Sequence, residues 1–200
     1  MSLLITDKII AACRKARACE EGLKWISAEP RTLKDLYEYR QDWAVWLAYS
    51  VPTLSDTVRT ELYTLTGCRT WWRNGQRHRN VGPAVEYSDG HREWWRNDKR
   101  HRENGPAIEF SDGSRAWYRN GKRHREDDPA IENTDGSRAW FRNGKLHRDD
   151  GPAWECNDGY RAWYRNGQLH RNDGPAVEYP DGYRAWWVNG LRVSAPEGSE

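Results

Sequence analysis

The sequence contains few aliphatic side chains, the usual material of a globular core. Leu, Ile, Val and Phe together account for 28 of its 200 residues, a share below the roughly 20% under which a highly charged chain is usually disordered. The net charge is nevertheless only +2, and the chain holds 13 Trp and 10 Tyr. Because disordered chains are poor in aromatic residues, we expect a folded protein whose core is built largely from aromatics.

Long apolar runs and an excess of one charge are also missing. No stretch approaches the ~20 apolar residues of a membrane helix, and the apolar start is broken by Asp7 and Lys8, unlike a secretory signal. We therefore expect no membrane partner. The sequence pI of about 8.3 lies below the value of ~9 that bulk nucleic-acid binders usually exceed.

The cysteines show neither a C-x-x-C pair nor a regular spacing. They are Cys13, Cys19, Cys68 and Cys156. This scatter argues against a disulfide framework and against a zinc site, and it favours reduced thiols in a cytoplasmic location.

Residues 1–66 are predicted to form a module of three or four helices. Apolar residues recur at three- and four-residue steps from Ile5 to Ile26, the period of one helix face. A capping box at residues 32–35 predicts a second helix, which continues or restarts through residues 42–47. A similar signal at residues 53–56 predicts a third helix over about 54–65, with Val58, Leu62 and Leu65 facing inward.

Residues 67–200 form an internal repeat of six units, the terminal ones incomplete. The step is 23 residues each time, without insertions. It relates the aromatic pairs Trp71-Trp72, Trp94-Trp95, Trp117-Tyr118, Trp140-Phe141, Trp163-Tyr164 and Trp186-Trp187. It also relates His78, His101, His124, His147 and His170, and the prolines five residues after each histidine. Such periodicity is typical of stacked repeat arrays.

Turn chemistry predicts that each unit contains two hairpins. Asn120-Gly121 is favoured in a two-residue loop at positive φ, which would place Arg119 opposite Lys122 and Trp117 opposite His124. If Asp135-Gly136 forms a second two-residue loop, Ile131 lies opposite Trp140. The predicted fold is therefore α+β, a helical module followed by an elongated antiparallel array of about twelve short strands.

The repeat resembles a known family. Residues 117–124, with the order aromatic-aromatic-Arg-Asn-Gly-Lys-Arg-His, and the later Asp135-Gly136 turn resemble the MORN repeat, and the Asp-Gly-Pro-Ala units are closer to MORN-variant repeats of bacterial and viral proteins. The resemblance covers residues 69–192 and implies a ribbon-like β-hairpin array used for binding. An Arg follows each histidine where classical units have Gly, which argues against the lipid binding of the classical family. Residues 18–25 and 42–47 are similar to a small module of phage-encoded proteins.

The five repeated histidines are predicted to be structural. Catalysis needs a single constellation of unlike groups, whereas each unit supplies the same His opposite the same Trp. Neighbouring units, about 10 Å apart, are too distant for their histidines to share one metal at ~2.1 Å. We expect these rings to pack on Trp and to hydrogen-bond a backbone or Asp group of the Asp-Gly-Pro bend. We predict no enzymatic activity, no catalytic residues, no metal and no cofactor.

Two columns of side chains are the candidate binding residues. The second aromatic column consists of Trp72, Trp95, Tyr118, Phe141, Tyr164 and Trp187, and the arginine column of Arg115, Arg138, Arg161 and Arg184. The aromatics either line an exposed binding face or are buried in a curled or two-layered array. The arginines either make cross-strand ion pairs with the glutamate column or contact an acidic or nucleic-acid partner.

The predicted function follows from the repeat and the aromatic columns. We expect a non-enzymatic protein-binding repeat module, in the manner of a phage-encoded protein that occludes a host protein such as a defence nuclease. The alternative is a nucleic-acid-binding protein that uses the Arg and aromatic columns. The identity of the partner, the oligomeric state and the half of the chain that makes the contact stay open.

Overall fold

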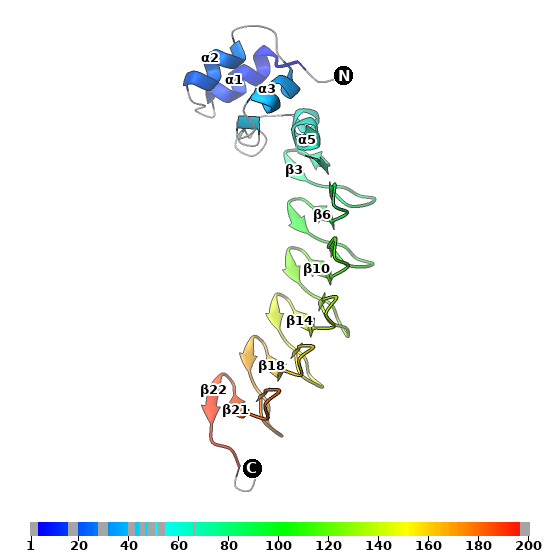
Figure 1. Ribbon diagram of the computed structural model, residues 1–200, viewed down its shortest axis with the longest axis vertical. Helices are drawn as coiled ribbons and strands as arrows, with labels where there is room; N and C mark the ends of the chain where they lie inside the picture. The colour runs from blue at the N-terminus through cyan, green and yellow to red at the C-terminus, as the bar shows by residue number, and fades with distance from the viewer. Residues whose placement is uncertain are drawn as a thin grey trace. The chain divides into compact units, whose positions relative to one another are not determined.

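The computed structural model of the chain describes residues 4–15, 20–27, 32–39, 43–44, 47, 51, 55–65 and 67–196. Short helices at the N-terminal end are followed by antiparallel strands joined by hairpins, so the predicted α+β class is confirmed (Figure 1). The chain divides into two compact units, residues 1–99 and 100–200. Helix changes to strand between Leu65 and Cys68, next to the composition change at residues 66 and 67.

The helices belong to the first unit and share one core. They are α1 (Asp7–Lys15), α2 (Glu20–Ser27), α3 (Leu33–Tyr39) and α5 (Asp56–Leu65). The prediction of one helix face from Ile5 to Ile26 was wrong, because two helices cover this range. An unbroken helix of that length would hold its ends roughly 30 Å apart, whereas α1 and α2 pack together and bury both Ile5 and Ile26 in the same core.

Two helix starts are capped close to where the sequence predicts. Thr32 and Asp35 form a capping box: the Asp35 N–H donates to Thr32 Oγ1 at 3.2 Å, and the Thr32 N–H donates to Asp35 Oδ2 at 2.6 Å. Helix α5 begins at Asp56, two residues later than predicted, since Ser55 Oγ is the acceptor for the Val58 N–H at 3.4 Å. The preceding Thr53 and Leu54 lie outside the described residues.

The strands of the first unit follow directly after α5, which packs against β1 and β2. They are β1 (Cys68–Thr70), β2 (Trp72–Arg73), β3 (Gln76–Arg77), β4 (Val85–Tyr87), β5 (Arg92–Glu93) and β6 (Trp95–Arg96), and β7 (Lys99–Arg100) lies at the division between the units. The order β1-β4-β5 is antiparallel, and β2 pairs with β3 in a separate two-stranded hairpin.

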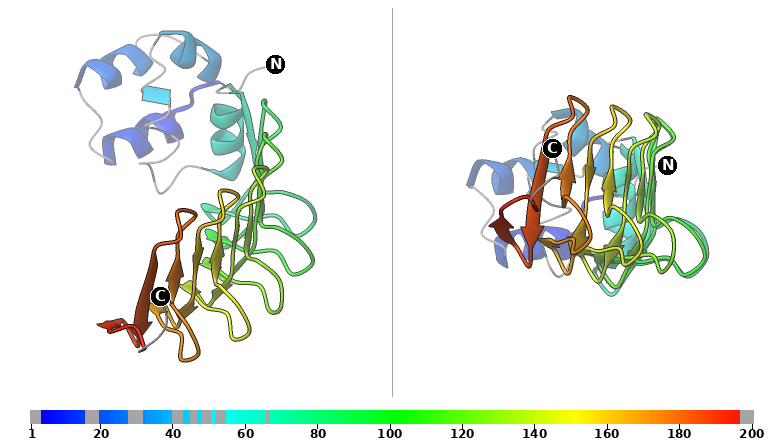
Figure 2. Two further views of the ribbon diagram at one scale, coloured as in Figure 1. Left: turned by 60° about the horizontal axis from the view of Figure 1, so that its bottom comes forward. Right: turned by 90° about the horizontal axis from the view of Figure 1, so that it is seen from below.

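The second unit repeats this arrangement. Its sheet has the antiparallel order β8 (Ile108–Glu109), β9 (Arg115–Ala116), β12 (Ile131–Glu132), β13 (Arg138–Ala139), β16 (Trp154–Glu155), β17 (Arg161–Ala162), β20 (Val177–Glu178), β21 (Arg184–Val188) and β22 (Leu191–Val193). Separate hairpins pair β10 (Tyr118–Arg119) with β11 (Lys122–Arg123), β14 (Phe141–Arg142) with β15 (Lys145–Leu146), and β18 (Tyr164–Arg165) with β19 (Gln168–Leu169). The same outline recurs along this unit, coloured green to red in Figure 2.

The Asn-Gly turns have the predicted geometry. Arg119 pairs with Lys122, and Asn120 and Gly121 both have positive φ, 53° and 81°, as a type I′ turn requires. The His124 N–H donates to the Trp117 carbonyl at 3.1 Å, which confirms that these two residues lie opposite each other.

The Asp-Gly turns differ from the prediction, and the register changes with them. Ile131 pairs with Ala139, not Trp140. The Asn133 N–H donates to the Ser137 carbonyl and the Gly136 N–H to the Asn133 carbonyl, both at 3.0 Å. The loop therefore has three residues and ends in a glycine at positive φ, a type I turn with a bulge. The extra residue moves each following side chain by one position relative to its partner.

This register decides what lies on each face of the sheet in the second unit. Directly paired residues share a face, so Ala116, Ala139, Ala162 and Ala185 lie with Ile108, Ile131, Trp154 and Val177 on what we call the alanine face. The four candidate arginines lie with the glutamate column on the opposite face, the arginine face.

Candidate binding surfaces

An arginine stacked on a tryptophan recurs through the array. Nη1 of Arg125 donates to the Pro129 carbonyl at 3.2 Å and to Glu132 Oε1 at 2.8 Å, and Cζ lies 4.1 Å from the ring centroid of Trp117. The same contacts occur for Arg79 on Trp71, Arg148 on Trp140 and Arg171 on Trp163. These arginines hold the bend against the sheet and form ion pairs with the glutamate column.

The repeated histidines join each 23-residue repeat to the next. The backbone N–H of the turn asparagine in the following unit donates to histidine Nδ1 at 3.1–3.3 Å in all five cases. In the second unit the turn glycine N–H also donates to a strand carbonyl one repeat earlier, as Gly144 does to Arg123 at 2.8 Å. Each turn is thereby bound to the preceding repeat. We expected the histidines to bond the Asp-Gly-Pro bend of their own repeat, whereas these contacts reach the turn of the next repeat.

The first turn has no preceding repeat, and helix α5 takes that place. Asp56 accepts the Asn74 N–H through Oδ2 and the Gly75 N–H through Oδ1, each at 2.9 Å. One carboxylate thus replaces the histidine Nδ1 and the strand carbonyl of the later repeats. Arg59 of the same helix lies with Cζ 5.3 Å from the Trp72 ring centroid.

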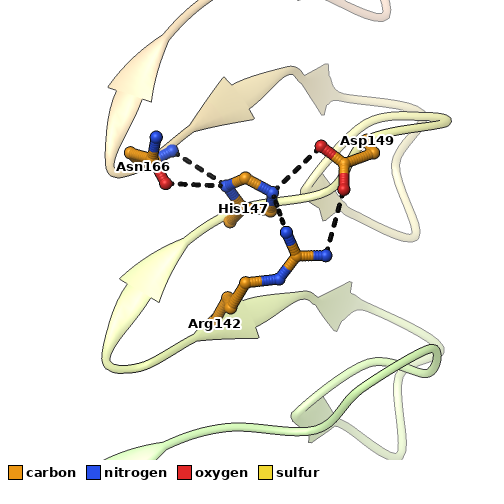
Figure 3. A network of polar contacts seen from close by, with 4 residues as sticks. All are labelled: Arg142, His147, Asp149 and Asn166. Atoms are coloured by element: carbon orange, nitrogen blue, oxygen red, sulfur yellow. Dashed lines mark hydrogen bonds and ion pairs between the residues drawn. The ribbon is translucent and has the colours of Figure 1, made fainter.

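In His147 and His124 the second ring nitrogen, Nε2, contacts an acidic residue two positions later in the chain. Figure 3 shows Asp149 between two side chains: Oδ1 lies 3.1 Å from His147 Nε2, and Oδ2 accepts from Arg142 Nη2 at 3.0 Å. The partner is Asp149, the residue before the Asp150-Gly151-Pro152 bend to which we expected the ring to hydrogen-bond. Hydrogen bonding from Arg142, with the nearby charges of His147 and Arg142, lowers the pKa of Asp149 despite partial desolvation.

The tautomer of His147 depends on which contacts it keeps. An Nε2–H ring donates to Asp149 and accepts the Asn166 N–H at Nδ1. The opposite tautomer accepts from Arg142 Nη1, 2.8 Å from Nε2, and donates to Asn166 Oδ1 at 3.1 Å. At His124 the Asn143 N–H reaches Nδ1 and Glu126 Oε1 lies 3.1 Å from Nε2, which requires the Nε2–H form.

The second aromatic column is covered, not exposed. Trp95 and Phe141 are buried, and Trp72, Tyr118, Tyr164 and Trp187 are half-buried. The Arg77 guanidinium lies 3.6 Å from the Trp95 ring centroid, and Arg123 lies 5.3 Å from Phe141. Phe141 also packs in a cluster with Ala130 and Ala139. The sequence left open whether these aromatics line an exposed binding face or are buried. The burial observed here corresponds to the buried arrangement.

The candidate arginines, by contrast, are exposed. Arg115, Arg138, Arg161 and Arg184 follow one another along the arginine face. Among the described residues their side chains make no hydrogen bond or ion pair, because the glutamates beside them are bound by the arginines of the bends. The predicted cross-strand ion pairs are therefore not formed by these four arginines.

An aromatic patch outside the two predicted columns of binding residues lies on the alanine face. The tyrosine patch, as we call it, comprises Trp154, Tyr160, Tyr179 and Tyr183. The Tyr160 and Tyr179 ring centroids lie 5.1 Å apart, and those of Tyr179 and Tyr183 lie 5.5 Å apart. Exposed fractions are 42% for Trp154, 44% for Tyr179 and 50% for Tyr183. The signal in the sequence is a departure from the third repeat, which carries Ile131 and Ser137 where the patch has Trp154, Tyr160 and Tyr183. The column of Tyr179 also holds the aromatics Tyr87 and Phe110.

Tyr160 is the half-buried member of the patch. Burial raises the pKa of its phenol to about 12, and the neighbouring Tyr164, Tyr179 and Cys156 add to the shift. Burial also raises the pKa of Tyr164. Trp154 donates its indole N–H to Cys156 Sγ at 3.0 Å, so the edge of the patch is ordered by a polar contact.

The described part of the chain has no group of three or more His, Cys, Asp or Glu side chains placed to hold a metal ion. In the helices described, none is long and apolar enough to cross a membrane.

No protein-family model matches the chain, and no curated protein matches it in sequence. The resemblance to MORN-variant repeats stays a prediction.

Proposed function

We propose that this chain is a non-enzymatic protein-binding repeat module and that the tyrosine patch is its contact surface. The observation that carries the proposal is the exposure of Tyr179 and Tyr183, whose ring centroids lie 5.5 Å apart, with Trp154 exposed on the same sheet face. Tyr and Trp are enriched where proteins bind one another, because they bury a large area while keeping a polar group for hydrogen bonding. A contiguous exposed aromatic patch is typical of an interaction site, whereas single exposed apolar residues are common on any protein surface.

The fold does not require these aromatics. At the same positions the third repeat has Ile131, Asn133 and Ser137, and its strands pair in the same register. Arg192 Nη2 donates to the Tyr183 hydroxyl at 2.7 Å, which adds an Arg, another residue common at binding hot spots, to the patch. The occlusion of a host protein by a phage-encoded chain in the cytoplasm remains the setting that we predict from the sequence.

The test is affinity capture followed by measurement with the purified partner. The full chain is used as bait in bacterial lysate, and the retained protein is identified and purified. Titration calorimetry then compares the wild type with the double variant Tyr179→Asn/Tyr183→Ser. We expect the variant to bind at least about tenfold more weakly, since hot-spot aromatics each contribute roughly 1–2 kcal/mol or more.

Both substitutions introduce residues that the third repeat already carries, so the fold is preserved. The matched control is Phe110→Asn, an exposed aromatic of the same column outside the patch, and it should bind like the wild type. Equal affinity of all three chains, or the failure of the bait to retain any protein, contradicts the proposal.

A second candidate function, nucleic-acid binding, is favoured by the row of exposed arginines. Arg115, Arg138, Arg161 and Arg184 are spaced two strands apart, about 10 Å, and can contact successive phosphates. Single-stranded oligonucleotide binding is measured between about 50 and 200 mM salt, where phosphate contacts predict a steep loss of affinity. Binding that is independent of salt, or unchanged in Arg138→Gln/Arg161→Gln, excludes this role for the arginine row.

A further inference from the structure

In two repeats the bend holds one carboxylate between an arginine and a histidine. In the fourth repeat it is the Asp149 carboxylate, which contacts both Arg142 and His147 (Figure 3). In the third repeat it is that of Glu126, whose Oε1 lies 3.4 Å from Arg119 Nη1 and 3.1 Å from His124 Nε2. The arginine of the hairpin and the histidine of the bend therefore form a two-donor clamp around a carboxylate.

The fifth repeat keeps the clamp but lacks the carboxylate. Arg165 and His170 follow Arg142 and His147 by 23 residues, and Asn172 stands where Asp149 would be. Within the described part of the chain, the Arg165 side chain and His170 Nε2 have no hydrogen-bond or ion-pair partner. This differs from the first repeat, in which Asn80 Oδ1 lies 2.8 Å from His78 Nε2.

The histidine is oriented to donate. The Asn189 N–H donates to His170 Nδ1 at 3.1 Å, so the neutral ring carries its proton on Nε2. Arg165 and His170 line the same open hollow, of about 740 Å³, together with Arg148, Arg171 and Asn172.

The other charges of this hollow are largely compensated. Arg148 and Arg171 bind Glu155 and Glu178. Asp149 binds Arg142, and Asp173 lies 3.1 Å from Arg171 Nε. Among the lining residues this leaves Arg165 as the uncompensated cation and Asp150 as the one acidic group without a partner among the described residues.

We propose that Arg165 and His170 form an anion-binding site of the fifth repeat, which takes an exogenous carboxylate or phosphate group in the position that Asp149 fills one repeat earlier. A guanidinium and an imidazole N–H suit either group, because both anions offer two oxygens to adjacent donors. The site lies in the bend and does not depend on the tyrosine patch, so the two proposals stand or fall separately.

The experiment is a titration of the full chain followed by NMR of its histidine side chains. Inorganic phosphate and acetate are added in separate arms at constant pH and ionic strength, which distinguishes the two ligand sources. We expect a saturable shift of the His170 resonances in at least one arm and none at His147, whose position is filled. Shifts that do not saturate, or that are equal at all histidines, overturn the proposal.

Variants taken from neighbouring repeats test the assignment. Asn172→Asp places a carboxylate of the chain itself between Arg165 and His170 and should abolish the saturable shift. Asp149→Asn empties the fourth repeat and should create a second responsive histidine, His147. Asp150→Asn removes the competing carboxylate and should strengthen binding.

Direct removal of the donor completes the test. Arg165→Gln should weaken binding about tenfold, the effect of losing one charge-assisted hydrogen bond. Lys122→Gln removes an exposed cation of the same unit outside the hollow and should leave binding unchanged. Equal affinity of these two variants, or saturable binding retained in Asn172→Asp, refutes the site.

Discussion

The Asp56 carboxylate of helix α5 accepts the backbone N–H of Gly75 at 2.9 Å, and its other oxygen accepts the Asn74 N–H. In the second unit these two kinds of donor bind a strand carbonyl and a histidine of the preceding repeat. The first turn of the array is therefore completed by a helix in place of a repeat. Helix α5 also packs against β1, the strand with which the sheet order begins, and so covers this end of the array.

Replacing Asp56 should loosen the first hairpin. In Asp56→Ala two backbone donors lose their acceptor, and we expect a loss of roughly 1–3 kcal/mol in local stability. Hydrogen exchange measures it directly: the Asn74 and Gly75 amides should exchange faster, while the equivalent Gly121 amide stays protected by the Arg100 carbonyl. Unchanged exchange at Asn74 and Gly75 would show that Asp56 does not act as a cap.

Replacing a stacked arginine by lysine should destabilise the array although the charge is kept. Arg125 combines a ring contact with Trp117 and hydrogen bonds to Pro129 and Glu132, and a lysine ammonium cannot reproduce the planar stack. We expect Arg125→Lys to lower the free energy of unfolding by about 1–2 kcal/mol, measured by urea denaturation. Arg138→Lys, at an exposed position, is the control and should have no effect; equal stability of both variants contradicts the structural role.

Alkaline pH should destabilise the protein through Tyr160. Burial raises the pKa of this phenol to about 12 from 10.0, so the folded state holds its proton more tightly than the unfolded state does. The stabilisation is fully present below pH 10 and is lost as the pH rises towards 12. Denaturation at several pH values should show a decline in this range that is shallower in Tyr160→Ser, a residue present at the equivalent positions 114 and 137. Parallel declines in both proteins would exclude this assignment.

Cys13 should react slowly with thiol reagents. It is buried in the helical core, and burial raises its pKa to about 11, so little of the reactive thiolate exists near neutral pH. Cys68 and Cys156 are half-buried and serve as internal references. Peptide mass spectrometry after timed alkylation should show modification of Cys13 last in the native protein and at a similar rate in urea. Early alkylation of native Cys13 contradicts its placement in the core.

Local signals in the sequence were sufficient for much of the fold. The Thr32–Asp35 cap and the Asn120-Gly121 turn depend on neighbouring residues and occur as predicted. The Asp135-Gly136 turn did not, because a glycine at positive φ suits both a two-residue loop and the bulge of a three-residue loop. Choosing between them requires knowing which strand pairing buries Ile131 against Ala139.

The candidate binding residues were predicted only in part, because their exposure depends on contacts made by residues elsewhere in the chain. The exposure of Arg138 and its row depends on which arginine binds the glutamate column, and Arg125 binds Glu132 from seven residues away through the bend. The tyrosine patch and the fifth-repeat clamp arise where single residues depart from the repeat, at Trp154 and Asn172. Such departures are visible in the sequence, but whether they create a binding surface depends on which side chains lie next to them in the folded chain.

A 23-residue β-hairpin repeat preceded by helices, with aromatics in place of an aliphatic core, can be read from the amino-acid order alone. Periodicity and turn chemistry are local properties, so they need no knowledge of the folded chain. The burial of particular aromatics, the lack of partners of particular arginines and the capping of the first turn by Asp56 become evident only in the folded chain. These depend on contacts between residues distant in sequence, where a one-residue change of register moves a side chain to the other face of the sheet.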